Sequence, residues 1–347
     1  MKRRFGLRGA GGGNCMKNRR DFANALALAL ALSLLGAPIM AAAQTAQRLP
    51  VVGVLTGNPD VRHPSIGRML RGLRELGYLE GKNFTLEFRS AAGKPTAFPA
   101  YAAELVSRKV DVIYAQGPAA INAAREATRV IPIVALDFET DPVQAGWARS
   151  LARPGGNLTG TFLDAPALAG KWIELLRAAA PGVRRMGLLW DSATGSAQLL
   201  AAQAAAQGFG IETQVMEVRS AGDVETALRA GLRAGIDAIV VLSSPELARS
   251  ETTKQIADFA AQNRLPAIAL WRAFPNAGGL MSYGHDVEIF TPRGGVLIGK
   301  ILNGANPGDL AIELPTKFEL VINLKTAKAM GITIPQALRL RADELIE

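Results

Sequence analysis

The sequence predicts an α/β protein made of two doubly wound lobes, each built on a parallel sheet, that are joined by a hinge. Short apolar runs rich in β-branched residues alternate with amphipathic helical segments, which is typical of parallel sheets with right-handed crossovers. The alternation pauses once, at residues 131–160, where an apolar run ends in a polar, acidic loop, and it then resumes. Two successive series of strands and helices therefore indicate two lobes, with residues 131–160 as the seam.

The first series begins with an apolar run at 51–55, which predicts a strand. A helix follows from Ser65, with Met69 and Leu73 on its apolar face, and it ends at Gly77. Further strands are expected at 84–88, 110–115, 131–136 and 158–162, and further helices at 99–109 and 119–128, with a short helix opened by Pro142.

The second series follows the same plan. Strands are expected at 186–190, 211–218, 238–242, 267–271 and 279–283, and helices at 167–179, 224–234 and 246–263, with an Ala-rich helix that ends near Gln207.

The tail decides how the lobes are joined. A helix expected at 287–302 and a strand expected at 318–322 can complete either lobe, so the chain should cross between lobes more than once. We expect an N-terminal lobe of residues 48–162 plus about 284–312, and a C-terminal lobe of 163–283 plus about 313–347. Several crossings would make a hinge around a cleft between the lobes.

The net charge of +9 is concentrated at the N-terminus. Residues 1–43 contain seven basic side chains and one acidic side chain, so the rest of the chain is nearly balanced. This distribution argues against a basic nucleic-acid-binding surface, and we expect no nucleic-acid partner.

The same N-terminal residues have the organisation of a secretory signal peptide. A basic region precedes an apolar run at 23–40, and the small residues 41–43 precede Gln44 as a cleavage site. Arg19-Arg20, followed by Asp21-Phe22, suggests the twin-arginine route, and Met16 is an alternative start. An uncleaved membrane anchor is the alternative interpretation.

The single cysteine, Cys15, would leave with the signal peptide, so the mature chain should have no disulfide, thiol nucleophile or thiolate metal site. No other segment approaches the roughly 18–20 apolar residues of a membrane span. We expect a soluble, periplasmic protein. Its two histidines, His63 and His285, have no metal-ligand spacing and are expected to be surface or loop residues.

Catalytic and cofactor motifs are mostly absent. No G-x-S-x-G elbow occurs, and no GxGxxG follows the first strand. The segment 294–300, GGVLIGK, resembles a phosphate-binding loop, but Ile301 replaces the magnesium-binding Ser or Thr. Its glycines lie within a helical apolar pattern and predict a helix that packs closely on a sheet. We therefore expect no catalytic residue, cofactor or metal.

Polar and aromatic residues follow the predicted strands and form the candidate ligand site. Hydroxyl groups suit a carboxylate, Asp137 or Glu139 suits an ammonium group, and Trp or Tyr suits a flat apolar body. The alternative for each residue is a structural role: Ser243-Ser244-Pro245 as a helix cap, or Trp190 and Trp271 in the core. The candidates are Thr56, Asn58, Gln116, Asp137, Glu139, Asp141, Trp190, Ser243, Ser244, Trp271 and Tyr283.

Several stretches resemble one family, the ABC transporter substrate-binding proteins of the tryptophan/tyrosine type. They are RGLRELGYLEGKNFTLEFR, AAELVSRKVDVI, DPVQAGWARSLARPGGNLTG and the tail PTKFELVINLKTAKAMGITIPQALRLRADELIE. The resemblance implies a type I periplasmic-binding-protein fold with three crossovers between two lobes. It also implies a ligand held in the cleft and passed to an ABC permease at the inner membrane.

The resulting interpretation is a monomeric, non-enzymatic binding protein for a small polar ligand such as an amino acid, aromatic or otherwise. Two alternatives stay open. One is an exported α/β hydrolase acting through Asp137 or Glu139, although the sequence offers no evident acid or base partner. The other is a ligand sensor that docks on a membrane receptor.

Overall fold

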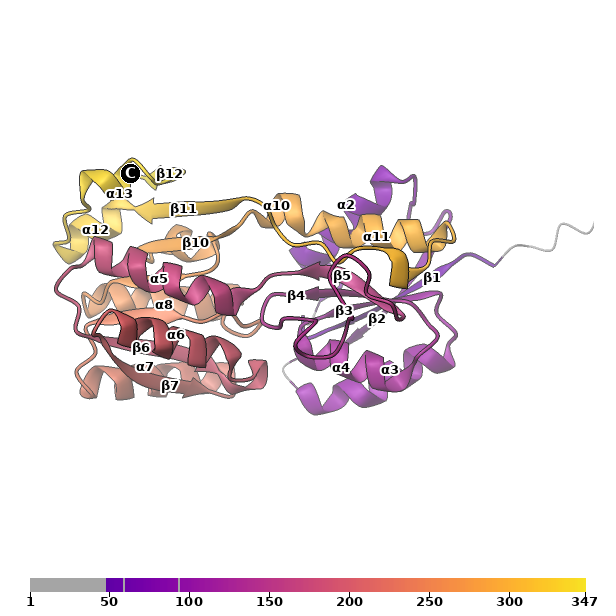
Figure 1. The fold of residues 1–347 in the computed structure, drawn as a ribbon, viewed down its shortest axis with the longest axis horizontal. Helices are drawn as coiled ribbons and strands as arrows, with labels where there is room; N and C mark the ends of the chain where they lie inside the picture. The colour runs from indigo at the N-terminus through magenta and orange to yellow at the C-terminus, as the bar shows by residue number, and fades with distance from the viewer. Residues whose placement is uncertain (1–47, 59, 93) are drawn as a thin grey trace, which may run out of the picture. The chain divides into compact units, whose positions relative to one another are not determined.

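The computed structural model describes residues 48–58, 60–92 and 94–347, and the segment Pro50–Glu347 forms one compact unit (Figure 1). The expected signal peptide lies outside the described residues. Within the described part of the chain, no helix combines the length and the apolar character that a membrane crossing requires.

The first sheet has the strand order β2-β1-β3-β4-β5, and all of its strands are parallel. Together with the second sheet it confirms the predicted α/β class with two mostly parallel sheets. Its strands are β1 (Val51–Thr56), β2 (Thr85–Ser90), β3 (Val112–Gln116), β4 (Ile133–Asp137) and β5 (Leu158–Phe162).

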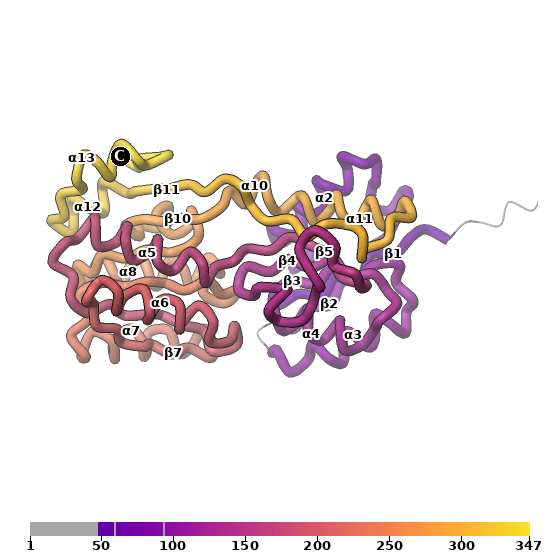
Figure 2. Tube along the Cα trace, viewed as in Figure 1, coloured from indigo at the N-terminus to yellow at the C-terminus, as the bar shows by residue number. Residues whose placement is uncertain are grey.

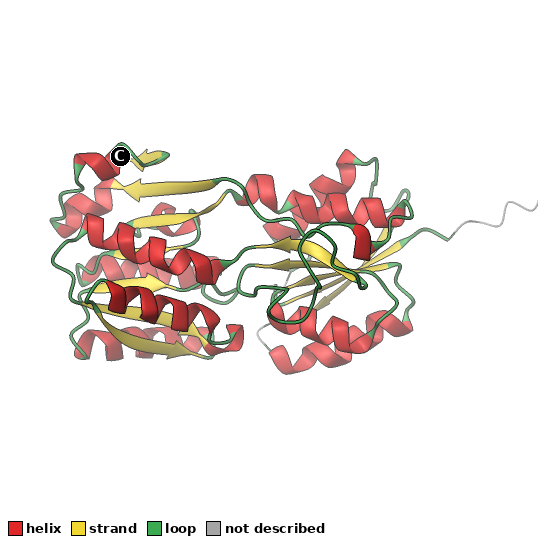
Figure 3. Ribbon diagram, in the orientation of Figure 1, coloured by secondary structure: helices red, strands yellow, loops and turns green. Residues whose placement is uncertain are grey.

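Helices cover both faces of the first sheet (Figure 3). Side chains alternate along a strand, so β1 sends Val52 and Val54 to one face and Leu55 to the other. The first face packs on α2 (Pro64–Glu75) and α11 (Pro292–Leu302). The second face packs on α3 (Phe98–Ser107), which follows η1 (Pro95–Ala97), and on α4 (Pro118–Ala127).

The second sheet has the order β12-β11-β10-β9-β8-β6-β7, and β11 runs antiparallel to β10. Helices α5 (Ala165–Ala179) and α6 (Ala197–Gly208) pack on one face, and α7 (Val224–Arg233) and α8 (Ser250–Gln262) on the other. The strands are β6 (Arg185–Asp191), β7 (Glu212–Val218), β8 (Ala238–Val241), β9 (Ala267–Ala269), β10 (Met281–His285), β11 (Phe318–Asn323) and β12 (Glu344–Ile346). The connections between these strands also contain short helical elements, namely η2 (Ser192–Thr194), η3 (Ala221–Asp223), α9 (Ala273–Asn276), α12 (Leu324–Met330) and α13 (Gln336–Arg339).

The chain passes between the two sheets three times, as the tube in Figure 2 shows. The first connection joins β5 to α5, the second joins β10 to α10 (Val287–Phe290), and the third joins the segment after η4 (Pro307–Asp309) to β11. The first and third connections begin side by side, because Glu313 forms a bridge with Thr161. Phe162 N–H donates to the carbonyl of Glu313 at 2.9 Å.

The glycine-rich segment 294–300 is helical, as predicted, and belongs to α11. A Cβ atom at Gly295 would lie 1.9 Å from the carbonyl oxygen of Met69, and one at Gly72 would lie 1.9 Å from the carbonyl oxygen of Pro292. These glycines therefore let α2 and α11 approach to backbone contact. Gly294 lies against the ring of Tyr114 on β3, so the same helix also packs closely on the sheet.

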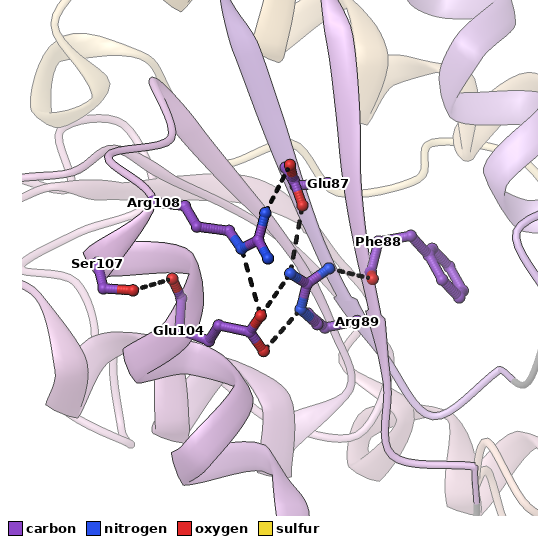
Figure 4. A network of polar contacts seen from close by, with 6 residues as sticks. All are labelled: Glu87, Phe88, Arg89, Glu104, Ser107 and Arg108. Atoms are coloured by element: carbon purple, nitrogen blue, oxygen red, sulfur yellow. Dashed lines mark hydrogen bonds and ion pairs between the residues drawn. The ribbon is translucent and has the colours of Figure 1, made fainter.

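An ion-pair network joins β2 to α3 in the first sheet (Figure 4). The guanidinium of Arg89 donates to both carboxylate oxygens of Glu104, at 2.7 and 2.9 Å, and lies 3.3 Å from Glu87. Arg108 also pairs with both acids. Hydrogen bonds from Arg89 hold the pKa of Glu104 below its usual value. The network fixes α3 at the edge of the sheet that β2 forms.

Three helix predictions were wrong, two in their bounds and one because the segment is not a helix. The helix expected at 287–302 is two helices, α10 and α11, because Pro292 cannot donate the hydrogen bond that would continue the first one. The helix expected at 246–263 begins only at Ser250. The helix expected after Pro142 is a series of turns, in which the Asp141 carboxylate accepts the N–H groups of Val143 and Gln144.

Candidate functional site

The carboxyl ends of strands from both sheets surround a cavity of about 140 Å³, here called the first compartment. The first sheet contributes Thr56, Gln116 and the loop after β4, and the second sheet contributes Ser244 and Trp271. A second compartment of about 100 Å³ adjoins it, because both share lining residues that include Asn58, Gln116 and Arg249. Such a crevice at strand ends is where open α/β sheets bind ligands.

The wall that the first sheet supplies is a hydrogen-bonded group of amides and hydroxyls. Strands β1 and β3 are neighbours, so Thr56 and Gln116 end side by side, and Thr56 Oγ1 donates to Gln116 Oε1 at 2.7 Å. The amide of Asn58 donates to the same oxygen at 3.0 Å and to Ser65 Oγ at 3.2 Å. His63 Nδ1 lies 2.9 Å from Ser65 Oγ and caps α2. These contacts hold the polar wall in one arrangement.

Two buried carboxyl groups follow β4. Asp137 is 1% exposed and Glu139 is 3% exposed. Asp137 Oδ1 accepts the N–H of Glu139 at 3.0 Å, whereas Asp137 Oδ2 has no hydrogen-bond partner within the described residues. Glu139 Oε1 accepts from Ser243 Oγ of the second sheet at 2.7 Å.

No Lys or Arg in the described ranges forms an ion pair with Asp137 or Glu139. Burial raises the pKa of both carboxyl groups, and the neighbouring charge of Asp137 raises the pKa of Glu139 further. The pair therefore favours a cation that would enter the compartment, since an opposite charge stabilises the ionised form.

The loop after β8 forms the wall of the second sheet. Ser244 Oγ donates to Asp191 Oδ2 at 2.6 Å and accepts the N–H groups of Glu246 and Leu247. This turn places Arg249 in the loop and not in α8. Arg249 lines both compartments, and its guanidinium lies 3.6 Å from the carboxylate of Glu246.

The structure brings most of the sequence candidates together. Thr56, Asn58, Gln116, Glu139, Ser244 and Trp271 all line the first compartment. Ser243 and Asp137 do not line either compartment themselves, but both contact Glu139: Ser243 Oγ donates to its carboxylate, and Asp137 accepts its N–H.

Three further candidates line neither compartment. Asp141 caps the turn that follows it. The indole of Trp190 donates to the carbonyl of Gly195 at 2.8 Å. Tyr283 stacks on Phe318, with ring centroids 5.8 Å apart. Each of the three has a structural partner in its own lobe.

Sequence reasoning missed several lining residues, among them His63, Phe138, Glu246 and Arg249. Arg249 was not among the candidates because the sequence predicts a helix over residues 246–263, which would place Arg249 inside the helix and not in a strand-end loop. The signal that could have found it is Ser244 followed by Pro245, since a serine that accepts the next N–H groups delays the helix.

The expectation that His285 is a surface or loop residue was wrong. It ends β10, which lies between β9 and β11, and it is 8% exposed. The rings of Phe290 and Phe138 pack against its imidazole, with ring centroids 5.0 Å and 4.7 Å away, respectively. His63 does lie in a loop, where it is half-buried against Ser65.

Comparisons with known proteins show what this chain is similar to. Residues 59–346 match the family described as ABC transporter substrate binding protein. The curated tyrosine-binding protein of Clostridioides difficile (strain R20291) is 28% identical over 280 residues, which cover 78% of this chain and 79% of that protein.

Two solved structures are similar along their whole length. The ABC domain from Streptococcus pneumonia in complex with L-Trp is 25% identical, with a TM-score of 0.75, and covers 86% of this chain and 100% of that one. A conserved domain protein from Vibrio cholerae is 27% identical, with a TM-score of 0.76 and the same coverage.

Proposed function

Because this chain belongs to the ABC transporter substrate-binding protein family, we propose that it binds an amino acid with an aromatic side chain in the two adjoining compartments. One observation carries this proposal: Glu139 and Arg249, which have opposite charges and belong to different lobes, line the same compartment. A zwitterionic head group offers an ammonium to the first residue and a carboxylate to the second.

The two charged residues have the capacity for these contacts. The buried carboxyl of Glu139 receives hydrogen bonds from Ser243 and from a backbone N–H, and retains lone pairs for an ammonium group. The guanidinium of Arg249 carries five donors, and its long contact with Glu246 leaves donors for a carboxylate, which it can bind bidentately.

The second compartment suits a flat apolar body. Its walls include Pro95, Phe98, Pro118, Ala119 and Ala193, and Phe98 is 6% exposed. Aromatic rings gain most from burial against such surfaces. The names of two relatives, one tyrosine-binding and one solved with L-Trp, support an aromatic ligand for this chain as well.

We further propose that the protein acts outside the cytoplasm and delivers its ligand to an ABC permease. The basic, apolar and small-residue regions of residues 1–43 support export by a cleaved signal peptide. Expression of the full chain followed by cell fractionation and measurement of the mature mass tests this point. A periplasmic product that begins near Gln44 is expected, whereas a full-length, membrane-bound product would favour the uncleaved anchor.

Calorimetric titration and thermal unfolding of the mature protein with L-Tyr, L-Trp, L-Asp and glucose test the ligand proposal. We expect the titration to detect binding of the aromatic amino acids, and these ligands should raise the melting temperature in a dose-dependent way. Mass spectrometry of the recovered ligand should find it unchanged. A chemically altered ligand would favour the hydrolase alternative, and binding of glucose alone would overturn the amino-acid assignment.

Two variants test the head-group contacts. Arg249→Met and Glu139→Gln should each weaken binding of both aromatic amino acids by about tenfold or more, because each removes a charge-assisted hydrogen bond. Arg229→Met is the control, since Arg229 pairs with Glu225 on the surface of α7 and lines neither compartment. Unchanged affinity in both site variants would contradict the proposed pose.

A further inference from the structure

Glu246 lines the second compartment, and only one oxygen of its carboxylate has a partner within the described residues. Its Oε2 lies 3.6 Å from Nη1 of Arg249. Its Oε1 is buried and finds no hydrogen-bond partner within the described residues, although the side chain as a whole is 19% exposed. A buried acceptor without a donor is costly, so a donor is expected when the compartment is filled.

The neighbouring polar oxygens of Asp191 and Thr194 on the same wall each have a hydrogen-bond partner. Asp191 accepts from the N–H of Ala193 at 2.9 Å and from Ser244 Oγ at 2.6 Å. Thr194 Oγ1 donates to the carbonyl of Asp191 at 2.8 Å. Glu246 is therefore the acidic residue of this wall with a carboxylate oxygen that has no hydrogen-bond partner within the described residues.

The surroundings define which donor would fit. Phe98, Pro118 and Ala119 offer apolar surface, and the exposed Lys94 also lines the compartment. A phenol hydroxyl can donate to Glu246 and accept from Lys94. An indole N–H can only donate, and an unsubstituted phenyl ring can do neither.

We propose that Glu246 is a specificity-determining residue that accepts a hydrogen bond from the ring substituent of the ligand, and so selects L-Tyr and L-Trp over L-Phe. This inference rests on the proposed function, because it requires the head group to occupy the first compartment. It adds that a hydrogen-bond donor on the ring, which L-Tyr has and L-Phe lacks, distinguishes two ligands of nearly equal size.

Affinities of the wild-type protein for L-Tyr, L-Trp and L-Phe test the inference directly. The wild type should bind L-Phe about 10- to 100-fold more weakly than L-Tyr, the usual range for a hydrogen bond to a charged group. In Glu246→Leu this ratio should fall to about threefold or less. Glu246→Gln keeps an acceptor oxygen at the same place and should retain more of the ratio than Glu246→Leu does.

The ratio separates specificity from a general loss of binding. Since Glu246 also contacts Arg249, its removal is expected to weaken all three ligands, and that effect cancels in the ratio of L-Tyr to L-Phe. Glu251→Leu, at an exposed position of α8 that lines neither compartment, is the matched control for folding and charge.

Two results would overturn the inference and leave the proposed function standing. One is equal affinity of the wild type for L-Tyr and L-Phe. The other is a ratio that Glu246→Leu does not change. A wild-type protein that binds none of the three amino acids would overturn the inference and the proposed function together.

Discussion

The ring of Phe138 packs against the ring of His285, with centroids 4.7 Å apart and planes inclined by 60°. Phe138 belongs to the loop after β4 and lines the first compartment beside Glu139. His285 ends β10, at the start of the second connection between the sheets. The contact therefore links the first compartment directly to a segment that joins the two sheets.

His285 should make the protein sensitive to acid. Both of its ring nitrogens are buried without a hydrogen-bond partner among the described residues, and burial lowers its pKa to about 4. The neighbouring Asp286 opposes this shift but does not outweigh burial, and Arg293, Glu313 and Lys317 line the same cavity. Since the unfolded state binds the proton more tightly, stability is lost as the pH falls from about 6.5 towards 4.

Urea unfolding at pH 7.5 and pH 5.5 measures this effect. When the pH falls from 7.5 to 5.5, protonation of His285 in the unfolded state should lower the free energy of unfolding by about 1 kcal/mol. The variant His285→Phe should lack this pH-dependent loss. Other groups titrate in both proteins, so the quantity to compare is the difference between wild type and variant at each pH. If wild type and variant differ in the free energy of unfolding by the same amount at pH 7.5 and at pH 5.5, His285 does not titrate as its burial predicts.

The candidate site was predictable where it depended on strand ends. Thr56, Gln116, Glu139, Ser244 and Trp271 each follow an apolar run, and parallel strands bring such residues to one edge of a sheet. The start of α8 was not predictable from periodicity, because residues 246–248 have helix-forming side chains, whereas the hydroxyl of Ser244 accepts the N–H groups of Glu246 and Leu247 before the helix begins.

Side-chain direction and non-local burial were also beyond the sequence pattern. Trp190 and Tyr283 follow the pattern of lining residues, but the carbonyl of Gly195 and the ring of Phe318 hold them elsewhere. His285 is buried by Phe138, which is distant in sequence and belongs to the other lobe. No local spacing reports a contact of that kind.

The close approach of α11 to α2 should not tolerate a methyl group. In Gly295→Ala the new Cβ would lie 1.9 Å from the carbonyl oxygen of Met69, so the helices must separate. We expect a loss of about 1–3 kcal/mol in the free energy of unfolding, measured by urea denaturation. Gly67→Ala on the exposed side of α2 is the control and should be neutral or stabilising, because nothing lies within 4 Å of the new atom. Equal stability of both variants would contradict backbone contact between α2 and α11.

Glu139→Gln should stabilise the protein while it weakens ligand binding. Burial raises the pKa of Glu139, so the stability that its protonated form contributes is lost as the pH rises through that elevated pKa. Glutamine keeps an acceptor for Ser243 Oγ and removes the cost of ionising a buried group. The variant should therefore melt at a higher temperature than wild type at pH 8, and the gain should shrink at pH 5.

Thermal unfolding across this pH range, with and without L-Tyr, measures both effects, and Glu251→Gln on exposed α8 serves as control. In wild type the ligand's ammonium would compensate the ionised carboxylate, so L-Tyr should raise the melting temperature more in wild type than in Glu139→Gln. A variant less stable than wild type at pH 8 would mean that the ionised carboxylate already has a stabilising partner. A residue that lowers the stability of the ligand-free protein and raises that of the liganded protein is expected at a binding site, because its charge is compensated only when the ligand is present.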